Sequence, residues 1–268
     1  MKDSELGAAK PSTVNKFLAI GVPLVGRPVA PEWALAFRGL HWPLNYNVAI
    51  VPTKGMEVGE ARNTIAKHAI DFGAKYLFFL DDDVAPPQHA IRHLMYALQN
   101  CDDPEKTMVA AGIYVGKWNP PEPFVFMDNG EGAYWRWKRG QVFECHMIGT
   151  GCMLINTEVF KHIPEPWFKT VDSWDENVPW KTEGAPVCGG VQVTDDLYFC
   201  NKVREAGFKI LADGDVLPIH WDYKPVIGKT GMVTDWQAFP WVLPEGCYPL
   251  REPEEAPKIE EITTSAAT

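Results

Sequence analysis

The feature that most constrains the fold of this chain is an apolar run at residues 76–80, Tyr-Leu-Phe-Phe-Leu, that ends abruptly in Asp81, Asp82 and Asp83. An apolar run of this length, bounded by polar sequence, predicts a strand that is buried on both faces. Alternate residues of an extended segment face the same side, so we expect Asp81 and Asp83 to converge while Asp82 points away. Neighbouring carboxylates repel one another unless they face water or a cation.

Two converging carboxylates at the C-terminal end of a buried strand predict a site for Mg²⁺ or Mn²⁺, because these ions prefer oxygen ligands. Such ions keep part of their coordination shell for water and substrate phosphates, which makes a nucleotide-linked substrate the expected partner. A solvated acidic turn is the alternative, and Pro86 and Pro87 just downstream suit it. Ligands of open α/β sheets bind at the carboxyl ends of the strands, and this favours the metal site.

The apolar patterns along the chain alternate between strand and helix periods, which predicts an open α/β sheet flanked by helices. Strands are expected at 16–23, 46–51, 76–80, 108–114, 151–155 and 208–212, and helices at 31–38, 57–72, 88–99 and 196–205. We expect residues 16–222 to form a single domain, preceded by a flexible stretch at 1–15. A short extension at 223–251 and a disordered tail at 252–268, rich in Pro, Glu, Thr and Ser, are expected to follow it.

The charge and composition of the chain exclude some classes of protein. A net charge of −10 argues against generic nucleic-acid binding, which needs clustered Lys and Arg. No run approaches the ~18 apolar residues of a membrane span, and the N-terminus lacks the apolar core of a signal peptide. The 6 cysteines form no CxxC pair. We therefore expect a soluble, cytoplasmic protein with reduced thiols.

A second acidic signal follows a Gly-Gly loop, where Asp195 and Asp196 open a predicted helix with Thr194 or Asp195 as its N-cap. Acidic residues in a first turn interact favourably with the helix dipole, and this structural role alone accounts for Asp195. A third signal is His220, just after a predicted strand. A lone His beside apolar residues is more often a core or surface group than a ligand.

Taken in order, these signals resemble the nucleotide-sugar-dependent glycosyltransferases of the GT-A fold, in the broad family 2-like group. The matching residues are Ala61-Arg62-Asn63 in a helix before the strand, the DxD motif Asp81-Asp82-Asp83, Thr194-Asp195-Asp196 with the downstream Arg204 and Ala206-Gly207-Phe208, and His220. The resemblance covers residues 16–222. The chain departs from the family pattern at Asp195, where a Glu is usual, and the shorter acid alters the reach of this carboxylate.

The resemblance implies a GT-A domain whose half at 16–114 binds the nucleotide and whose half at 115–222 binds the acceptor. It also implies that Asp81, Asp83 and His220 hold the metal, and an imidazole ligand favours Mn²⁺ over Mg²⁺. The residues implied to contact the nucleotide or donor sugar are Pro23, Arg62, Asn63, Asp81, Asp82 and Gly151. Arg62 equally suits a structural ion pair, and Gly151 equally suits a plain tight turn.

By the same resemblance, Asp196 is the general base and Asp195 positions the acceptor. The acid-Asp pair favours transfer with inversion. Trp174 and Trp180 lie where this fold builds its acceptor site, and aromatic faces stack on sugars, although most Trp residues are core anchors. The expected reaction is metal-dependent transfer from a nucleoside-diphosphate sugar, with UDP favoured, to a glycan or another hydroxyl compound.

Three other functions are alternatives to sugar transfer. A HAD-type phosphatase also uses DxD, but the later acidic motif fails because Gly214-Asp215 is followed by no acid until Asp222. A nucleotidyltransferase shares the metal and the nucleotide, and residues 21–27 only faintly resemble its Gly-rich loop. A catalytically inactive carbohydrate-binding relative would lack some of the acids, and this chain has them all.

Overall fold

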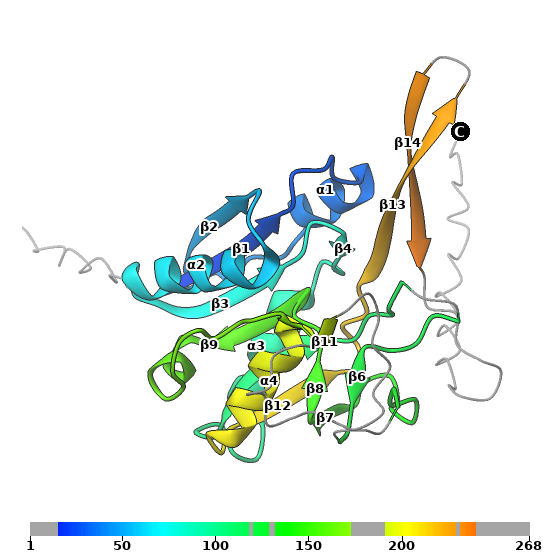
Figure 1. The fold of residues 1–268 in the computed structure, drawn as a ribbon. Coiled ribbons are helices and arrows are strands. Elements are labelled where there is room, and N and C mark those ends of the chain that lie inside the picture. The colour runs from blue at the N-terminus through cyan, green and yellow to red at the C-terminus, as the bar shows by residue number, and fades with distance from the viewer. Residues whose placement is uncertain (1–15, 118–119, 129–131, 173–190, 229–230, 240–268) are drawn as a thin grey trace, which may run out of the picture.

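The structure is a computed structural model that describes residues 16–117, 120–128, 132–172, 191–228 and 231–239 (Figure 1). The predicted flexible stretch at 1–15, the predicted tail at 252–268 and both Trp174 and Trp180 lie outside the described residues.

A mixed sheet of seven strands organises the molecule, in the order β2-β1-β3-β9-β5-β12-β7. Its strands are β1 (Phe17–Leu24), β2 (Asn47–Lys54), β3 (Ala74–Leu80), β5 (Thr107–Gly112), β7 (Val142–Cys145), β9 (Cys152–Asn156) and β12 (Lys209–Asp213). β1 runs parallel to both β2 and β3, whereas β9 lies antiparallel between β3 and β5. The predicted α/β fold with an open mixed sheet flanked by helices is confirmed.

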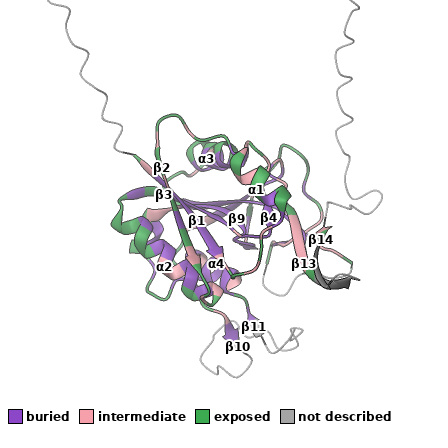
Figure 2. Cartoon of the chain, turned by 90° about the horizontal axis from the view of Figure 1, so that it is seen from above, coloured by how far each residue is buried: buried purple, intermediate pink, exposed green. Residues whose placement is uncertain are grey.

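Strand β3 shows why the apolar run before the acids is unbroken. Tyr76, Phe78 and Leu80 belong to the core on one face of the sheet, while Leu77 and Phe79 belong to the core on the other. Viewed along the sheet, α3 covers one face and α2 and α4 cover the other (Figure 2). A strand with helices on both sides buries side chains on both faces, so residues 76–80 carry no polar alternation.

The helices are α1 (Pro31–Arg38), α2 (Val58–Asp71), α3 (Ala90–Asn100) and α4 (Asp195–Glu205), with a 3₁₀ turn η1 (Thr157–Lys161). Helix α2 begins at Glu57, which accepts a hydrogen bond from the Glu60 amide, and ends before Gly73, whose φ of 67° suits glycine. No helix in the described part of the chain is long and apolar enough to cross a membrane.

Gly21 lets α2 approach the sheet closely, because a Cβ there would stand 2.4 Å from Cγ2 of Ile65. The strand that contains Gly21 continues through Pro23 to Leu24, one residue beyond the predicted end. Its pairing with β3 stops at Gly21, so the missing amide of Pro23 costs no bond to β3.

Shorter strands and a hairpin complete the structure. The short strands are β4 (Val84–Ala85), β6 (Val125–Phe126), β8 (Met147–Ile148), β10 (Val171–Asp172) and β11 (Val191–Val193). The hairpin joins β13 (Ile219–Gly228) to β14 (Gly231–Phe239) and extends beyond the sheet and helices (Figure 1). β13 also pairs with β4, directly after the three acids, and it runs across residue 222, the predicted domain boundary.

Candidate active site

Three elements hold the backbone of the acidic triplet. The amide of Asp81 donates to the carbonyl of Gly151, before β9, at 3.1 Å. The carbonyl of Asp81 accepts a bond from Nε1 of Trp33 in α1 at 2.7 Å. The carbonyl of Asp83 accepts a bond from the amide of Trp221 in β13, also at 2.7 Å. The three carboxylates are therefore placed by the sheet, a helix and the hairpin together.

The side chain of Asp82 faces the loop between β1 and α1. It is buried and accepts bonds from the amide of Val25 at 3.2 Å and from Nη2 of Arg27 at 2.9 Å. These contacts tie the loop to the end of β3. In this structure Asp82 therefore orients the loop that borders the site.

The two oxygens of Asp83 have different partners. Oδ2 accepts bonds from Arg27 and from Nζ of Lys117, the latter at 2.5 Å, while Oδ1 lies 3.6 Å from Nε2 of His220. Burial alone would raise the pKa of Asp83, but the interactions with His220 and Lys117 outweigh it and hold the pKa well below its usual range. Asp83 therefore stays ionised.

His220 presents one ring nitrogen to Asp83. Its Nδ1 lies 2.8 Å from the carbonyl of Val115, which can only accept, so Nδ1 carries the proton. The ring of Tyr114 packs edge-on against the imidazole, with 5.2 Å between the centroids. A backbone carbonyl that fixes the tautomer in this way is typical of His ligands to metal ions.

Oδ1 of Asp83 and Nε2 of His220 stand 3.6 Å apart, so that one divalent cation could contact both. Among the described residues, no group of three His, Cys, Asp or Glu side chains stands together as a metal site. Two protein ligands nevertheless suffice for an ion such as Mg²⁺, which completes its shell with water and phosphate oxygens. Asp81, the third predicted ligand, is bound to Arg62 instead.

Arg62 joins the two acidic motifs in the interior. Nη2 contacts both carboxylate oxygens of Asp81, at 2.8 and 2.7 Å, and Nη1 donates to Asp195. Although burial alone would lower the pKa of this guanidinium, the charges of Asp195 and Asp81 raise it. Burial also raises the pKa of Asp81, against the opposing effect of Arg62. Of the two roles considered for Arg62, this structure places it in a buried ion pair.

Asp195 and Asp196 open α4, as predicted, and Thr194 is the N-cap residue. Asp196 is buried and accepts bonds from the hydroxyl of Thr194 and from the amide of Leu197, the latter at 2.9 Å. Burial, followed by the neighbouring charge of Asp195, raises the pKa of Asp196 to about 7, and Arg62 opposes this rise. A carboxyl group with such a pKa exchanges its proton near neutral pH.

Gly151 lies within the site. Its amide donates to the hydroxyl of Tyr114 at 3.1 Å, and a Cβ here would stand 3.1 Å from Oδ2 of Asp81. The preceding Thr150 is fully buried, and its hydroxyl has no hydrogen-bond partner in the described part of the chain.

Two other predicted donor-binding residues have structural contacts. Asn63 donates to the carbonyls of Gly59 and Phe168 and accepts from the amides of Trp167 and Phe168, so it fixes the 167–168 segment against α2. Pro23 is buried near the C-terminal end of β1 and pairs with Thr53 of β2.

Unpartnered polar atoms are concentrated at this site. Five buried side-chain atoms have no hydrogen-bond partner among the described residues, and these are Nε of Arg27, Oγ1 of Thr53, Nε of Arg62, Oγ1 of Thr150 and Nε1 of Trp221. All but Thr53 belong to residues that contact the acidic triplet or, for Thr150, adjoin one that does. Buried polar groups are rarely left unpaired, so this concentration favours a polar ligand.

Sequence reasoning missed several residues of the site. Arg27 ends the faint Gly-rich pattern of residues 21–27, which begins within β1, and that pattern is its only signal. The sequence predicts that Tyr114 ends the strand at 108–114, but the structure ends β5 at Gly112, and nothing in the sequence distinguishes Tyr114 or the following Lys117 as site residues. Trp33 lies in the predicted helix at 31–38, and no sequence signal sets it apart from the other apolar residues of that helix.

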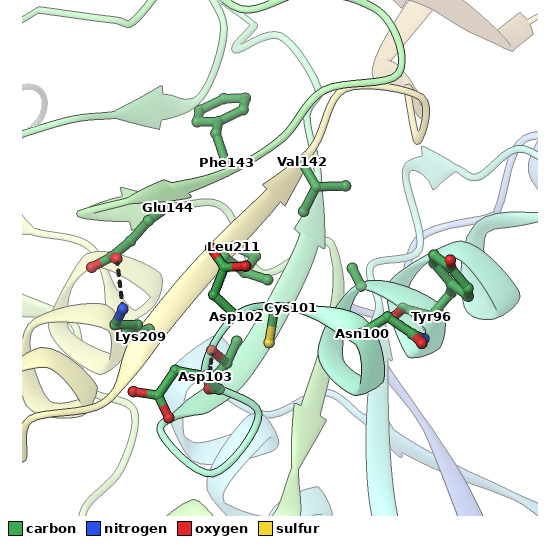
Figure 3. A pocket seen from close by; sticks show the side chains of 12 residues that line it. Tyr96, Asn100, Cys101, Asp102, Asp103, Val142, Phe143, Glu144, Lys209 and Leu211 are labelled. Carbon is green, nitrogen blue, oxygen red and sulfur yellow. Dashed lines mark hydrogen bonds and ion pairs between the residues drawn. The ribbon is translucent and has the colours of Figure 1, made fainter.

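A groove of about 360 Å³ lies elsewhere, between α3, β7 and the start of β12 (Figure 3). Lys209 and Glu144 form an ion pair across it, at 3.5 Å. It lies at the amino end of β5 and β12, whereas the acidic triplet lies at the carboxyl end of β3. It therefore does not extend the site.

Neither a family model nor a curated protein matches the sequence. Solved structures do match. The protein A197 from STIV has a TM-score of 0.49 and 18% identity, over 76% of this chain and 85% of that one. TarS from S. aureus, in complex with UDP-GlcNAc, has a TM-score of 0.40 and 14% identity, over 75% and 58%. GalNAc-T7, with UDP, GalNAc and Mn²⁺, has a TM-score of 0.48 and 9% identity, over 76% and 43%.

This chain thus spans less than two thirds of the length of the TarS and GalNAc-T7 chains. These three TM-scores lie below 0.5, so the likeness is distant, and the chemistry of the site rests on the residues of this chain.

Proposed function

We propose that this protein transfers a sugar from a nucleoside-diphosphate sugar to an acceptor hydroxyl with the help of a divalent cation. The observation that carries the proposal is the meeting of the two acidic motifs at the carboxyl end of β3, joined by buried Arg62. The unpartnered polar atoms around them support a polar ligand there. The ordered motifs of the sequence support the same reaction.

The charge of the site supports the need for a cation. Five carboxylates, those of Asp81, Asp82, Asp83, Asp195 and Asp196, face three basic side chains, those of Arg27, Arg62 and Lys117. When all five are ionised, two negative charges remain in excess. A diphosphate entering this site adds further negative charge, and a divalent cation offsets the repulsion.

Asp83 and His220 would hold the cation, which as a Lewis acid stabilises the charge that develops on the leaving diphosphate. Lys117 and Arg27 lie beside the same carboxylate and are the nearest protein cations for phosphate oxygens. Gly151 lets the backbone lie close to Asp81, because a Cβ there would stand 3.1 Å from Oδ2 of Asp81, and the free hydroxyl of Thr150 suits a sugar hydroxyl. UDP is the favoured nucleotide, and Mn²⁺ suits the imidazole ligand.

Asp196 is the proposed general base. Its carboxylate takes the proton of the acceptor hydroxyl, the acceptor oxygen bonds to the anomeric carbon, and the bond from that carbon to the diphosphate breaks. A pKa of about 7 suits this role, because a base works best when its pKa lies near the working pH. Attack opposite the leaving group inverts the anomeric centre. Asp195, held by Arg62, is a positioning residue beside the base.

Calorimetric titration with a panel of nucleotide sugars, first with Mn²⁺ and then with EDTA, tests the proposal. We expect one donor to bind with Mn²⁺ and to be released by EDTA, and its slow hydrolysis to give free nucleoside diphosphate. Asp83→Ala should abolish the Mn²⁺-dependent binding, whereas Asp103→Asn, which alters a carboxylate outside the site, should leave it unchanged.

Other results would contradict the proposal. Release of pyrophosphate from a nucleoside triphosphate and a sugar phosphate would indicate a nucleotidyltransferase. Carbohydrate binding without any bound nucleotide would indicate a binding protein.

A further inference from the structure

Two cationic side chains share one oxygen of Asp83. Arg27 and Lys117 both donate to Oδ2, and His220 faces Oδ1. The Asp83 side chain is only 11% exposed, so these contacts fill most of its surroundings. A divalent ion placed beside Oδ1 would have two protein cations as close neighbours, and like charges repel in such a site.

The side chains of Arg27 and Lys117 also have room to leave Asp83. The side chains of Arg27 and Lys117 are 25% and 24% exposed, so each already reaches solvent. Nζ of Lys117 lies 4.0 Å from Asp222, and Nε of Arg27 has no partner among the described residues. Arg62 differs, because it is 4% exposed and is fixed between Asp81 and Asp195.

From this arrangement we propose that Lys117 and Arg27 occupy Asp83 in the ligand-free protein and move to the diphosphate when the nucleotide binds. The inference rests on the proposed function and adds a coupling to it. The diphosphate draws the two cations away from Oδ2, and Asp83 then accepts the divalent ion more readily. Nucleotide and ion therefore strengthen each other's binding, by the same factor in both directions.

The coupling predicts effects of opposite sign on the two ligands when Lys117 is neutralised. Lys117→Met removes one competitor of the ion, so Mn²⁺ alone should bind about fivefold more tightly than to the wild type. The same change removes one partner of the diphosphate, so UDP at saturating Mn²⁺ should bind about fivefold or more weakly. A purely structural Lys117 would weaken both ligands or neither.

The experiment is a pair of calorimetric titrations on the full chain, with Mn²⁺ alone and then with UDP at saturating Mn²⁺. Lys117→Arg keeps the charge and should restore the wild-type values of both constants. Lys106→Met removes a distant surface charge of the same kind and should change neither. Lys117→Gln repeats the test with a polar side chain, and thermal melts confirm that each variant is folded.

The outcomes separate the coupling from the function. Tighter Mn²⁺ and weaker UDP in Lys117→Met support the coupling. Unchanged or weaker Mn²⁺ binding in that variant, while the wild type binds UDP with Mn²⁺, overturns the coupling and leaves the proposed function standing. Failure of the wild type to bind any nucleotide overturns both.

Discussion

Asp83 and Asp196 are two buried carboxylates of one site, and their surroundings push them in opposite directions. Asp83 lies among Arg27, Lys117 and His220, which hold its pKa well below the usual range. Among the described residues, Asp196 accepts bonds from two neutral groups, the hydroxyl of Thr194 and the amide of Leu197, and burial raises its pKa to about 7. One group is built to keep its charge, and the other is built to exchange a proton.

The two carboxyl groups are expected to change the stability of the fold with pH in opposite directions. For Asp83 the folded-state pKa is lowered, so its contribution is present above about pH 4 and is lost as the pH falls further. For Asp196 the folded-state pKa is raised, so its contribution is present below about pH 4 and is lost as the pH rises through about 7. The opposite shifts match the two roles of the proposed function, in which Asp83 holds a cation and Asp196 accepts a proton.

The most direct test of the contrast between Asp83 and Asp196 removes the proposed proton acceptor, Asp196, and leaves Asp83 intact. Asp196→Asn should lower turnover by about 10²–10⁴-fold, because the acceptor hydroxyl loses its base. Binding of UDP and Mn²⁺ should stay nearly unchanged. Initial rates of nucleoside diphosphate release, with matched titrations, measure both.

Glu205→Gln alters an exposed carboxylate at the far end of the same helix and serves as the control. Full turnover in the Asp196→Asn variant would exclude Asp196 as the base.

A second change tests the residue that connects the two acidic regions. Arg62→Met leaves the carboxylates of Asp81 and Asp195 without their shared cation. The free energy of unfolding should fall by about 3–5 kcal/mol, as expected when one partner of a buried ion pair is removed. Urea denaturation measures the loss.

Lys67→Met is the matched control, since it removes a cation of the same helix from an exposed pair with Glu165. That change should cost less than about 1 kcal/mol. Equal losses in the two variants would show that Arg62 contributes no more than a surface charge.

Sequence periodicity predicted the parts of this site that lie on regular elements. The apolar run fixed β3 and the place of Asp81 to Asp83, and the spacing of apolar residues fixed α2 with Arg62. Contacts made by loops were out of reach, because Arg27 and Lys117 depend on turns that follow no period. The predicted role of Asp81 as a metal ligand, beside its bond to Arg62, stays a prediction.

A third change, at Asp195, tests how the neighbouring charge sets the pH dependence of the rate. In the wild type the rate should rise with pH and level off above about 7, because only ionised Asp196 accepts the proton. Asp195→Asn removes the negative charge that raises the pKa of Asp196, while the positive charge of Arg62, which lowers that pKa, remains. The apparent pKa of the rate profile should fall by about one unit.

The profile of kcat/KM against pH provides this measurement, with the Glu205→Gln variant for reference. A profile that keeps its midpoint after Asp195→Asn would contradict the electrostatic link between the two acids. A loss of rate without a shift would indicate that Asp195 only holds the structure.

The smallest expected effect concerns the hydroxyl of Tyr114, which accepts a hydrogen bond from the amide of Gly151. Tyr114→Phe leaves the buried amide of Gly151 without its acceptor, and the free energy of unfolding should fall by about 1–2 kcal/mol. Thermal denaturation detects this loss. Tyr96→Phe, at a ring that is 69% exposed, should be neutral, and a neutral Tyr114→Phe would show that Gly151 finds another partner.

The pairing of β13 with β4 has a mechanical consequence. His220 and Trp221 lie at the start of β13, where they contact Asp83, and the same strand then runs outward into the hairpin. The residues that contact Asp83 and the outermost part of the described molecule thus belong to one continuous strand (Figure 1). Any displacement of the inner end of the hairpin would therefore move His220 relative to Asp83, the two residues proposed to hold the cation.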